Sequence, residues 1–227
     1  MRKVEKDSEI ISEALTLKGK TIIDIGCGTG DLVRWLNSEG ANAVGLDTPG
    51  MLAKAVKIEP EIRDHSIAGL AQCLPFKKNS ADSFVYFASL HHIEKRFISD
   101  SLKECHRVLK YSGKAVIVEP VGRKGSYFEV VRLVEDEREI QAYAYSVIES
   151  SAEIGLKIME EKFVFFERKY RDYRKLIATF VDNQDIAIKV LSEAKEIYTR
   201  FARERGVAWD DFPFRSICRI NILEKTG

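Results

Sequence analysis

The stretch KTIIDIGCGTGDLVRWLNSEG, residues 20–40, decides the fold. Its apolar run around Ile22–Ile25 predicts a strand that is buried on both faces of a sheet. A turn follows in which three glycines alternate with small residues. The next segment, DLVRWLNSEG, predicts a helix that ends at Gly40. A strand, a glycine-rich turn and a helix in this order are how many α/β proteins hold a nucleotide-like ligand.

The same alternation of strand and helix continues to Pro120. An amphipathic helix is expected before the first strand, at 8–17. Further strands are expected at 42–47, 84–87 and 114–120, and further helices at 49–58 and 94–110. Such alternation predicts a parallel sheet with helices on both faces.

After Pro120 the pattern changes. Residues 126–156 have a mostly helical pattern, 157–170 predict a strand, 171–205 a charged helix, and 214–225 a last strand. No repeat and no linker rich in Gly or Pro divides the chain, so we expect a single domain over residues 1–227.

Composition excludes several classes of protein. Of the 227 residues 45% are hydrophobic and 31% are charged, which is typical of a globular protein. The net charge of +1 gives no general argument for nucleic acid or an anionic membrane. No apolar run approaches the roughly 18 residues that span a bilayer. The charged start, MRKVEKDSEIISEAL, lacks the apolar segment of a signal peptide and favours a cytoplasmic location.

The cysteines do not form a metal or disulfide pattern. No Cys-x-x-Cys pair occurs, and only His106 adjoins one of them. We therefore expect no metal site and mostly buried thiols. The four cysteines are Cys27, Cys73, Cys105 and Cys218.

The glycine turn indicates a ligand without phosphates. Its pattern is Gly26-x-Gly28-x-Gly30, and Asp31 stands where a dinucleotide fingerprint has its third glycine. A carboxylate there would repel a pyrophosphate. The Gly-Lys-Ser/Thr of a P-loop is also absent. Asp24, at the carboxyl end of its strand, suits a cationic group.

A second acid of the chain indicates a further part of the ligand. Asp47 ends the next strand, where an acid would hold a ribose with two free hydroxyls. The expected ligand has a ribose, an amino group and no phosphate. S-adenosylmethionine meets all three conditions.

Four segments resemble, in order, motifs of the class I S-adenosylmethionine-dependent methyltransferases, and most closely the subgroup of small-molecule and ubiquinone/menaquinone-type enzymes. They are DIGCGTG, GLDTPGMLAKA, CLPFKKNSADSFVYFASLHHI and LKECHRVLKYSGKAVIVEP, within about residues 20–120. The resemblance implies a Rossmann-like fold. It has a seven-stranded, mostly parallel sheet with an antiparallel last strand, helices on both faces and a helical insertion before the last strand.

The resemblance also implies binding residues for the cofactor. The methionine part would lie against Asp24, Gly26, Cys27, Gly28 and Gly30. Asp47 would hold the ribose, Thr48 and Met51 would adjoin the adenine, and Leu70, Ala71 and Gln72 would face its edge. Ser89 would lie where cofactor and substrate meet.

One departure from the family concerns the adenine. The family commonly has Asp where this chain has Leu70. Either Gln72 or backbone carbonyls replace that contact, or adenine binding is weaker.

Candidate catalytic residues lie at or after the ends of the predicted strands 84–87 and 114–120. His91 and His92 could act as a general base, or could only end the strand and pack beneath the cofactor. Glu119 could meet the substrate or close the pocket. An aromatic substrate lid is expected from Tyr127, Tyr143 and Tyr145, although such tyrosines also serve as packing.

The leading hypothesis is methyl transfer to a small-molecule acceptor by in-line displacement, giving S-adenosylhomocysteine. Segments 121–150 and 169–212 would enclose the substrate, and the second could instead join two subunits, which leaves a homodimer open. A tRNA methyltransferase of the wobble-uridine type is the runner-up, since the segment SLHHIEKRFISDSLKECHRVLK at 89–110 resembles such enzymes. RKYRDYRK at 168–175 interleaves basic and aromatic residues as a nucleic-acid surface does, but a solvated helix face has the same pattern. An inactive methyltransferase-like partner subunit is the third hypothesis, kept open by Leu70.

Overall fold

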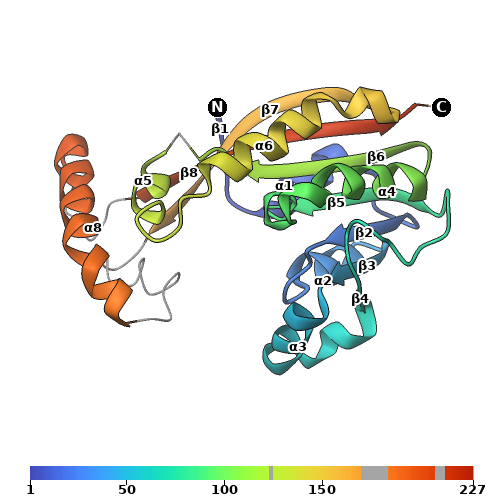
Figure 1. Ribbon diagram of the computed structural model, residues 1–227, viewed down its shortest axis with the longest axis horizontal. Helices are drawn as coiled ribbons and strands as arrows, with labels where there is room; N and C mark the ends of the chain where they lie inside the picture. The colour runs from blue at the N-terminus through green and yellow to red at the C-terminus, as the bar shows by residue number, and fades with distance from the viewer. Residues whose placement is uncertain (123–124, 170–183, 208–212, 227) are drawn as a thin grey trace. The chain divides into compact units, whose positions relative to one another are not determined.

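The computed structural model describes residues 1–122, 125–169, 184–207 and 213–226 (Figure 1). The chain divides into two compact units. The smaller comprises residues 1–5, 120–141 and 163–218, and the larger comprises residues 6–119, 142–162 and 219–227. Each is described by itself.

Eight strands form the sheet in the order β1-β7-β8-β6-β5-β2-β3-β4. The pairs β2–β3, β2–β5, β3–β4 and β5–β6 are parallel. The arrows of β6 and β8 point in opposite directions (Figure 1). The strands are β1 Arg2–Val4, β2 Thr21–Ile25, β3 Asn42–Asp47, β4 Ser66–Ala68, β5 Ala81–Phe87, β6 Leu109–Pro120, β7 Leu156–Lys169 and β8 Pro213–Lys225.

The α-helices described are α1 Asp7–Ala14, α2 Asp31–Ser38, α3 Pro49–Ile58, α4 Ile98–Val108, α5 Ser126–Val131, α6 Arg138–Glu149 and α8 Gln184–Arg205. Four short 3-10 helices accompany them: η1 Pro60–His65, η2 Leu90–His92, η3 Lys95–Phe97 and η4 Ser151–Ile154. In the described part of the chain no helix is both long and apolar enough to cross a bilayer.

Strand β2 is the centre of the larger unit, because it pairs with β3 on one side and β5 on the other. The side chains of Ile22, Ile23 and Ile25 are buried, as their apolar run predicts. Helix α3 begins where Thr48 Oγ1 accepts a hydrogen bond from Met51 N at 3.3 Å, with Pro49 in its first turn. The carboxyl ends of β2 and β3 therefore lead directly into turns and helices.

The smaller unit has an apolar core of its own. Helix α8 packs against α5, and the rings of Tyr198 and Phe214 lie 4.8 Å apart between their centroids. Strand β1 pairs in parallel with the end of β7, with Val4 opposite Phe166. The buried members of this core are Val130, Val190, Ala194, Ile197, Tyr198, Ala202 and Phe214.

The predicted fold class is confirmed, with one strand more than the seven expected. The additional strand is β1, whose three residues are too few for a periodic pattern. Strand β6 begins at Leu109 rather than at 114, so the preceding helix ends at Val108. The predicted helix 171–205 is found at 184–205, and 170–183 lie outside the described residues. The single-domain organisation stays a prediction.

Gly30 has a packing role that its motif does not reveal. Its φ is +80°, and a Cβ at this position would lie 1.9 Å from Cδ1 of Ile62. Ile62, in η1, is fully buried. The glycine turn is thus held against the segment that follows α3.

We predict that Gly30→Ala lowers the free energy of unfolding by roughly 2–4 kcal/mol, since it adds a strained left-handed residue to an overpacked contact. Gly50→Ala is the control, because Gly50 lies in α3 with no atom within 4 Å of the added Cβ. That variant should keep or slightly gain stability. Urea unfolding of the ligand-free proteins measures both. Equal midpoints for the two variants would contradict the packing role.

Candidate functional site

A cavity of about 560 Å³ lies at the carboxyl ends of β2, β3 and β5 in the larger unit. This end of a parallel sheet is where α/β proteins bind ligands. Most of the cofactor-binding residues expected from the sequence line it: Gly26, Gly28, Asp47, Thr48, Met51, Leu70, Ala71, Gln72 and Ser89, together with His92.

The glycine turn brings backbone to the cavity wall. A Cβ on Gly26, which has a φ of +76°, would lie 2.6 Å from Cβ of Ser89, so only glycine fits there. Gly28 also has a positive φ, of +52°, but no atom lies within 4 Å of its Cβ position. Gly26 therefore serves packing, whereas Gly28 leaves open space beside the cavity.

The carboxylate of Asp47 is fixed at the end of β3 by two backbone groups. Its Oδ2 accepts a hydrogen bond from Gly28 N at 2.9 Å, and its Oδ1 accepts one from Thr48 N at 2.7 Å. These bonds join the glycine turn to the start of α3. They also orient an acid on the cavity wall, where its remaining lone pairs can accept further hydrogen bonds.

Asp24 is buried next to this site but does not line the cavity. Only 3% of the residue is exposed. Burial, helped by the negative charge of Asp47, raises its pKa from 3.8 to about 7. A cationic group nearby would favour the charged form of this carboxylate.

Glu119 ties the end of β6 to the turn after β5. Its Oε1 accepts hydrogen bonds from Ser89 N at 3.1 Å and Leu90 N at 3.0 Å, and its Oε2 pairs with His91 Nδ1. The side chains of Glu119 and His91 are each 2% exposed. Neither lines the cavity, because each is turned into this pair.

The structure separates the two histidines that the sequence offered as a base. His92 lines the cavity and is exposed, whereas His91 is buried against Glu119. The hydroxyl of Ser89 also lines the cavity, and its Oγ is buried without a hydrogen-bond partner in the described structure. A polar group of a ligand could supply that partner.

Several predicted residues do not reach the cavity. Gly30 packs against Ile62, and burial raises the pKa of the Cys27 thiol to about 12, which makes it a poor nucleophile. The ring of Tyr143 lies 4.7 Å from Lys95 Nζ. Tyr145 stacks on Arg219, and Tyr127 packs on the apolar core of the smaller unit. The substrate roles of the three tyrosines stay predictions.

The sequence did not indicate some of the cavity residues. Ile93 and Glu94 line the cavity from between η2 and η3, and Phe97 lines it from η3. Gly69 and Ala88 line it beside the expected binding residues. Each lies within a few residues of a recognised motif. Their adjacency was the available signal, but only the fold of these turns shows which side chains face inward.

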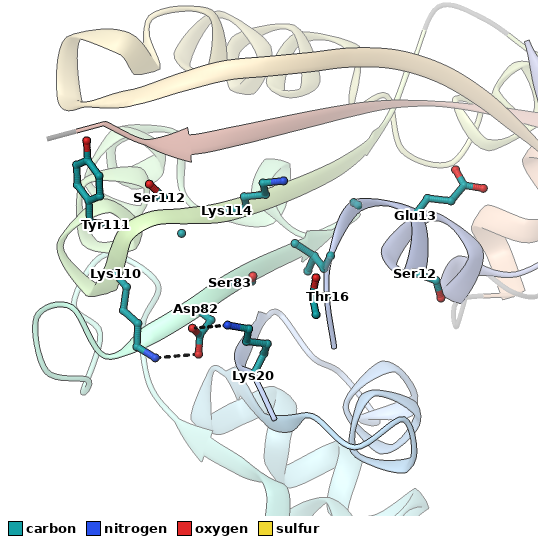
Figure 2. Close-up of a pocket in the computed structure, with 13 residues that line it drawn as sticks. Ser12, Glu13, Thr16, Lys20, Asp82, Ser83, Lys110, Tyr111, Ser112 and Lys114 are labelled. Carbon is teal, nitrogen blue, oxygen red and sulfur yellow. Dashed lines mark hydrogen bonds and ion pairs between the residues drawn. The ribbon is translucent and has the colours of Figure 1, made fainter. Parts of the chain in front are cut away.

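A second cavity of about 530 Å³ lies at the other ends of the strands (Figure 2). Its central acid, Asp82, is already paired with Lys110 at 2.9 Å and Lys20 at 3.5 Å. The unpartnered hydroxyl of Ser89 and the buried acid Asp24 lie near the first cavity instead. We therefore take the first cavity as the candidate site.

The raised pKa of Asp24 makes a prediction for the ligand-free protein. Asp24 keeps its proton up to about pH 7 when folded, but only to about pH 4 when unfolded. The folded state therefore binds more protons over this range, and the contribution of Asp24 to stability falls as pH rises from 4 to 7.

We expect Asp24→Asn to be more stable than the wild type at pH 8, by up to about 4 kcal/mol, and equal to it near pH 4. Urea unfolding at both pH values tests this. A stability difference that does not change with pH would show that Asp24 titrates normally.

Comparison with known proteins finds relatives for the part of the chain around this site. Residues 23–117 match the family described as methyltransferase domain. A demethylmenaquinone methyltransferase of Chlorobaculum parvum is 38% identical over 104 residues, 44% of this chain and 41% of that protein. A chloroplastic 2-methyl-6-phytyl-1,4-hydroquinone methyltransferase of Arabidopsis thaliana is 33% identical over 105 residues, 44% of this chain and 30% of that protein. The chain thus spans less than half the length of these curated relatives.

The fold is also found among solved structures. The crystal structure of a suggested methyltransferase from Bacillus halodurans superposes with a TM-score of 0.67 over 97% of this chain and 98% of that one. The sequences are only 16% identical, so this likeness concerns the fold alone. Residues 23–117 are thus similar to a methyltransferase domain, and the fold of the whole chain resembles that of the Bacillus halodurans structure.

Proposed function

We propose that this chain binds S-adenosylmethionine in the cavity at the carboxyl ends of β2, β3 and β5 and transfers its methyl group to a small-molecule acceptor. One observation carries the proposal. The carboxylate of Asp47 is oriented on the cavity wall by Gly28 N and Thr48 N, beside backbone that leaves open space at Gly28. An acid at this strand end suits the two hydroxyls of a ribose.

The residues around the cavity fit the rest of this cofactor. Met51, Leu70 and Phe97 offer apolar surface for an adenine ring, and Gln72 offers an amide on the same wall. The buried Oγ of Ser89 lacks a partner that a polar ligand would supply. Asp24 is an acid whose charged form a nearby ammonium or sulfonium would favour.

S-adenosylmethionine supplies a methyl group already activated on a positively charged sulfur. The protein then has to orient the acceptor and exclude water, and orientation can contribute roughly 7–11 kcal/mol in favourable cases. We assign the positioning of the turn 89–92 to the Glu119–His91 pair. We assign the removal of a proton from the acceptor, where one must leave, to His92 on the cavity wall.

The small-molecule acceptor is favoured over tRNA by charge. Quinone precursors are the substrates named for the relatives, and the net charge of +1 gives little attraction for a nucleic acid backbone. The basic and aromatic stretch at 168–175 that favoured tRNA extends beyond the described residues. An inactive partner subunit is the other alternative, because Leu70 is 47% exposed on the cavity wall where the family has an acid.

Cofactor binding tests the proposed function directly. Calorimetric titration should show binding of S-adenosylmethionine and of S-adenosylhomocysteine, and Asp47→Ala should weaken both at least tenfold by removing a charged hydrogen-bond acceptor. Asp31→Ala is the matched control, since Asp31 is an acid of the same turn that is 81% exposed and lies outside the cavity. No binding to the wild type would favour the inactive-subunit alternative.

The second prediction separates the histidines. His91→Asn should lower the free energy of unfolding by roughly 1–3 kcal/mol, because the buried Oε2 of Glu119 loses its partner. His92→Asn should leave stability and S-adenosylhomocysteine affinity nearly unchanged, and should slow transfer to an acceptor that loses a proton by at least about 100-fold. Unfolding, calorimetry and a radiolabelled methyl assay measure the three quantities. Full activity of His92→Asn would remove it as the base.

A further inference from the structure

Arg219 is a buried cation that the function proposed above does not use. It lies on β8, beside β6, and is only 7% exposed. Two groups hold its guanidinium. Its Nε donates a hydrogen bond to Oδ1 of Asn221 at 3.0 Å, and the ring of Tyr145 lies 3.4 Å from its central carbon, measured to the ring centroid. A stacked ring covers the face of a guanidinium and leaves the N–H groups at its edge available.

No carboxylate forms an ion pair or a hydrogen bond with Arg219 in the described structure, although the charges of Glu161, Glu119 and Glu149 act on it from a greater distance. Glu161 belongs to the same cluster, but its Oε2 accepts hydrogen bonds from Tyr145 at 3.0 Å and from Asn221 at 2.8 Å. It therefore orients the two residues that hold Arg219. Glu119, on the neighbouring strand, is occupied by the turn after β5. Buried arginines ordinarily pair with an acid, because an isolated buried charge is costly.

The two Nη groups of Arg219 have no hydrogen-bond partner in the described part of the chain. They are also not among the fully enclosed side-chain atoms that lack a partner, so they border accessible space. Burial lowers the pKa of Arg219, but a guanidinium stays charged at any physiological pH. Two parallel N–H groups in that position match a carboxylate or phosphate, which they can bind in a bidentate manner.

Arg219 does not itself line the cavity, and Glu119 links it to the cavity wall. The charge of Glu119 acts on Arg219, and Glu119 holds Ser89 on the cavity wall. On α6, Tyr143 lies two residues before Tyr145, and Lys95 Nζ lies over its ring. In the sequence, Lys95 stands between the cavity residues Glu94 and Phe97. A second positive charge therefore lies near the same helix.

We propose that Arg219 binds an anionic group of the methyl acceptor, so that the acceptor is a small carboxylic acid or phosphate ester. The acceptor role rests on the function proposed above, whereas the anion site itself does not. Tyr145, Asn221 and Glu161 act as positioning residues for the guanidinium.

Binding of simple anions tests the site. Phosphate and acetate, each compared with chloride at equal ionic strength, should raise the melting temperature of the wild type. Arg219→Met should abolish this rise, and Arg219→Lys should weaken the apparent affinity at least tenfold. Arg215→Met is the matched control, because Arg215 is on the same strand but is 40% exposed and paired with Glu167 at 3.0 Å. Loss of the effect in Arg215→Met, or no effect in the wild type, would overturn the proposal.

Stability without anions distinguishes binding from a structural role. If Arg219 is kept for a ligand, Arg219→Met should melt at the same temperature as the wild type or higher, because an unneutralised buried charge has been removed. A lower melting temperature for both Arg219 variants would make the residue structural.

Steady-state kinetics test whether Arg219 binds the methyl acceptor. A phenolic carboxylic acid and its methyl ester should be methylated with different KM, the acid being favoured at least tenfold by the wild type and not by Arg219→Met. Similar KM values for the acid and its ester in the wild type would overturn the assignment to the acceptor. S-adenosylhomocysteine should bind Arg219→Met as it binds the wild type. Failure of that cofactor to bind the wild type would instead refute the proposed function and leave the anion site standing.

Discussion

The structure of the cavity in the larger unit depends on the hydrogen bonds that the carboxylate of Glu119 makes with the turn after β5. Glu119 is a buried acid at the end of β6, and it accepts two backbone hydrogen bonds from the turn after β5 while pairing with His91. That turn carries Ser89 and His92 into the cavity. Glu119 therefore anchors the turn that lines the cavity to the end of a neighbouring strand.

Two other buried ionisable groups form no ion pair among the described residues, Asp24 at the end of β2 and Arg219 on β8. Each carries a cost in the free protein, and each is complementary to what the proposed reaction would bring, a cationic cofactor and an anionic acceptor. The domain thus gives up stability at the two positions where a ligand could return it. Glu119 and Asp47 differ from them, since backbone groups already satisfy both acids.

Much of this arrangement could be predicted from the sequence, for a physical reason. Buried parallel strands need continuous apolar runs, so β2, β3, β5 and β6 were recognisable, and the acid predicted at the end of β3 lines the cavity. The three-residue β1 has too short a pattern to recognise. Local sequence also could not show that His91 turns inward and His92 outward, because that depends on Glu119, 28 residues further along the chain. Nor could it show that Arg219 forms no ion pair with the acids of the described residues.

The contact between Gly30 and Ile62 affects how such a sequence should be interpreted. The third glycine of the turn is required by a buried isoleucine beneath it, and it does not line the cavity. A descendant of this chain that lost its ligand would still be selected to keep that glycine, since replacing it would lower the stability of the domain. The repeated glycines therefore report an intact domain. An oriented acid such as Asp47, which lines the cavity itself, is the better sign that a ligand site has been kept.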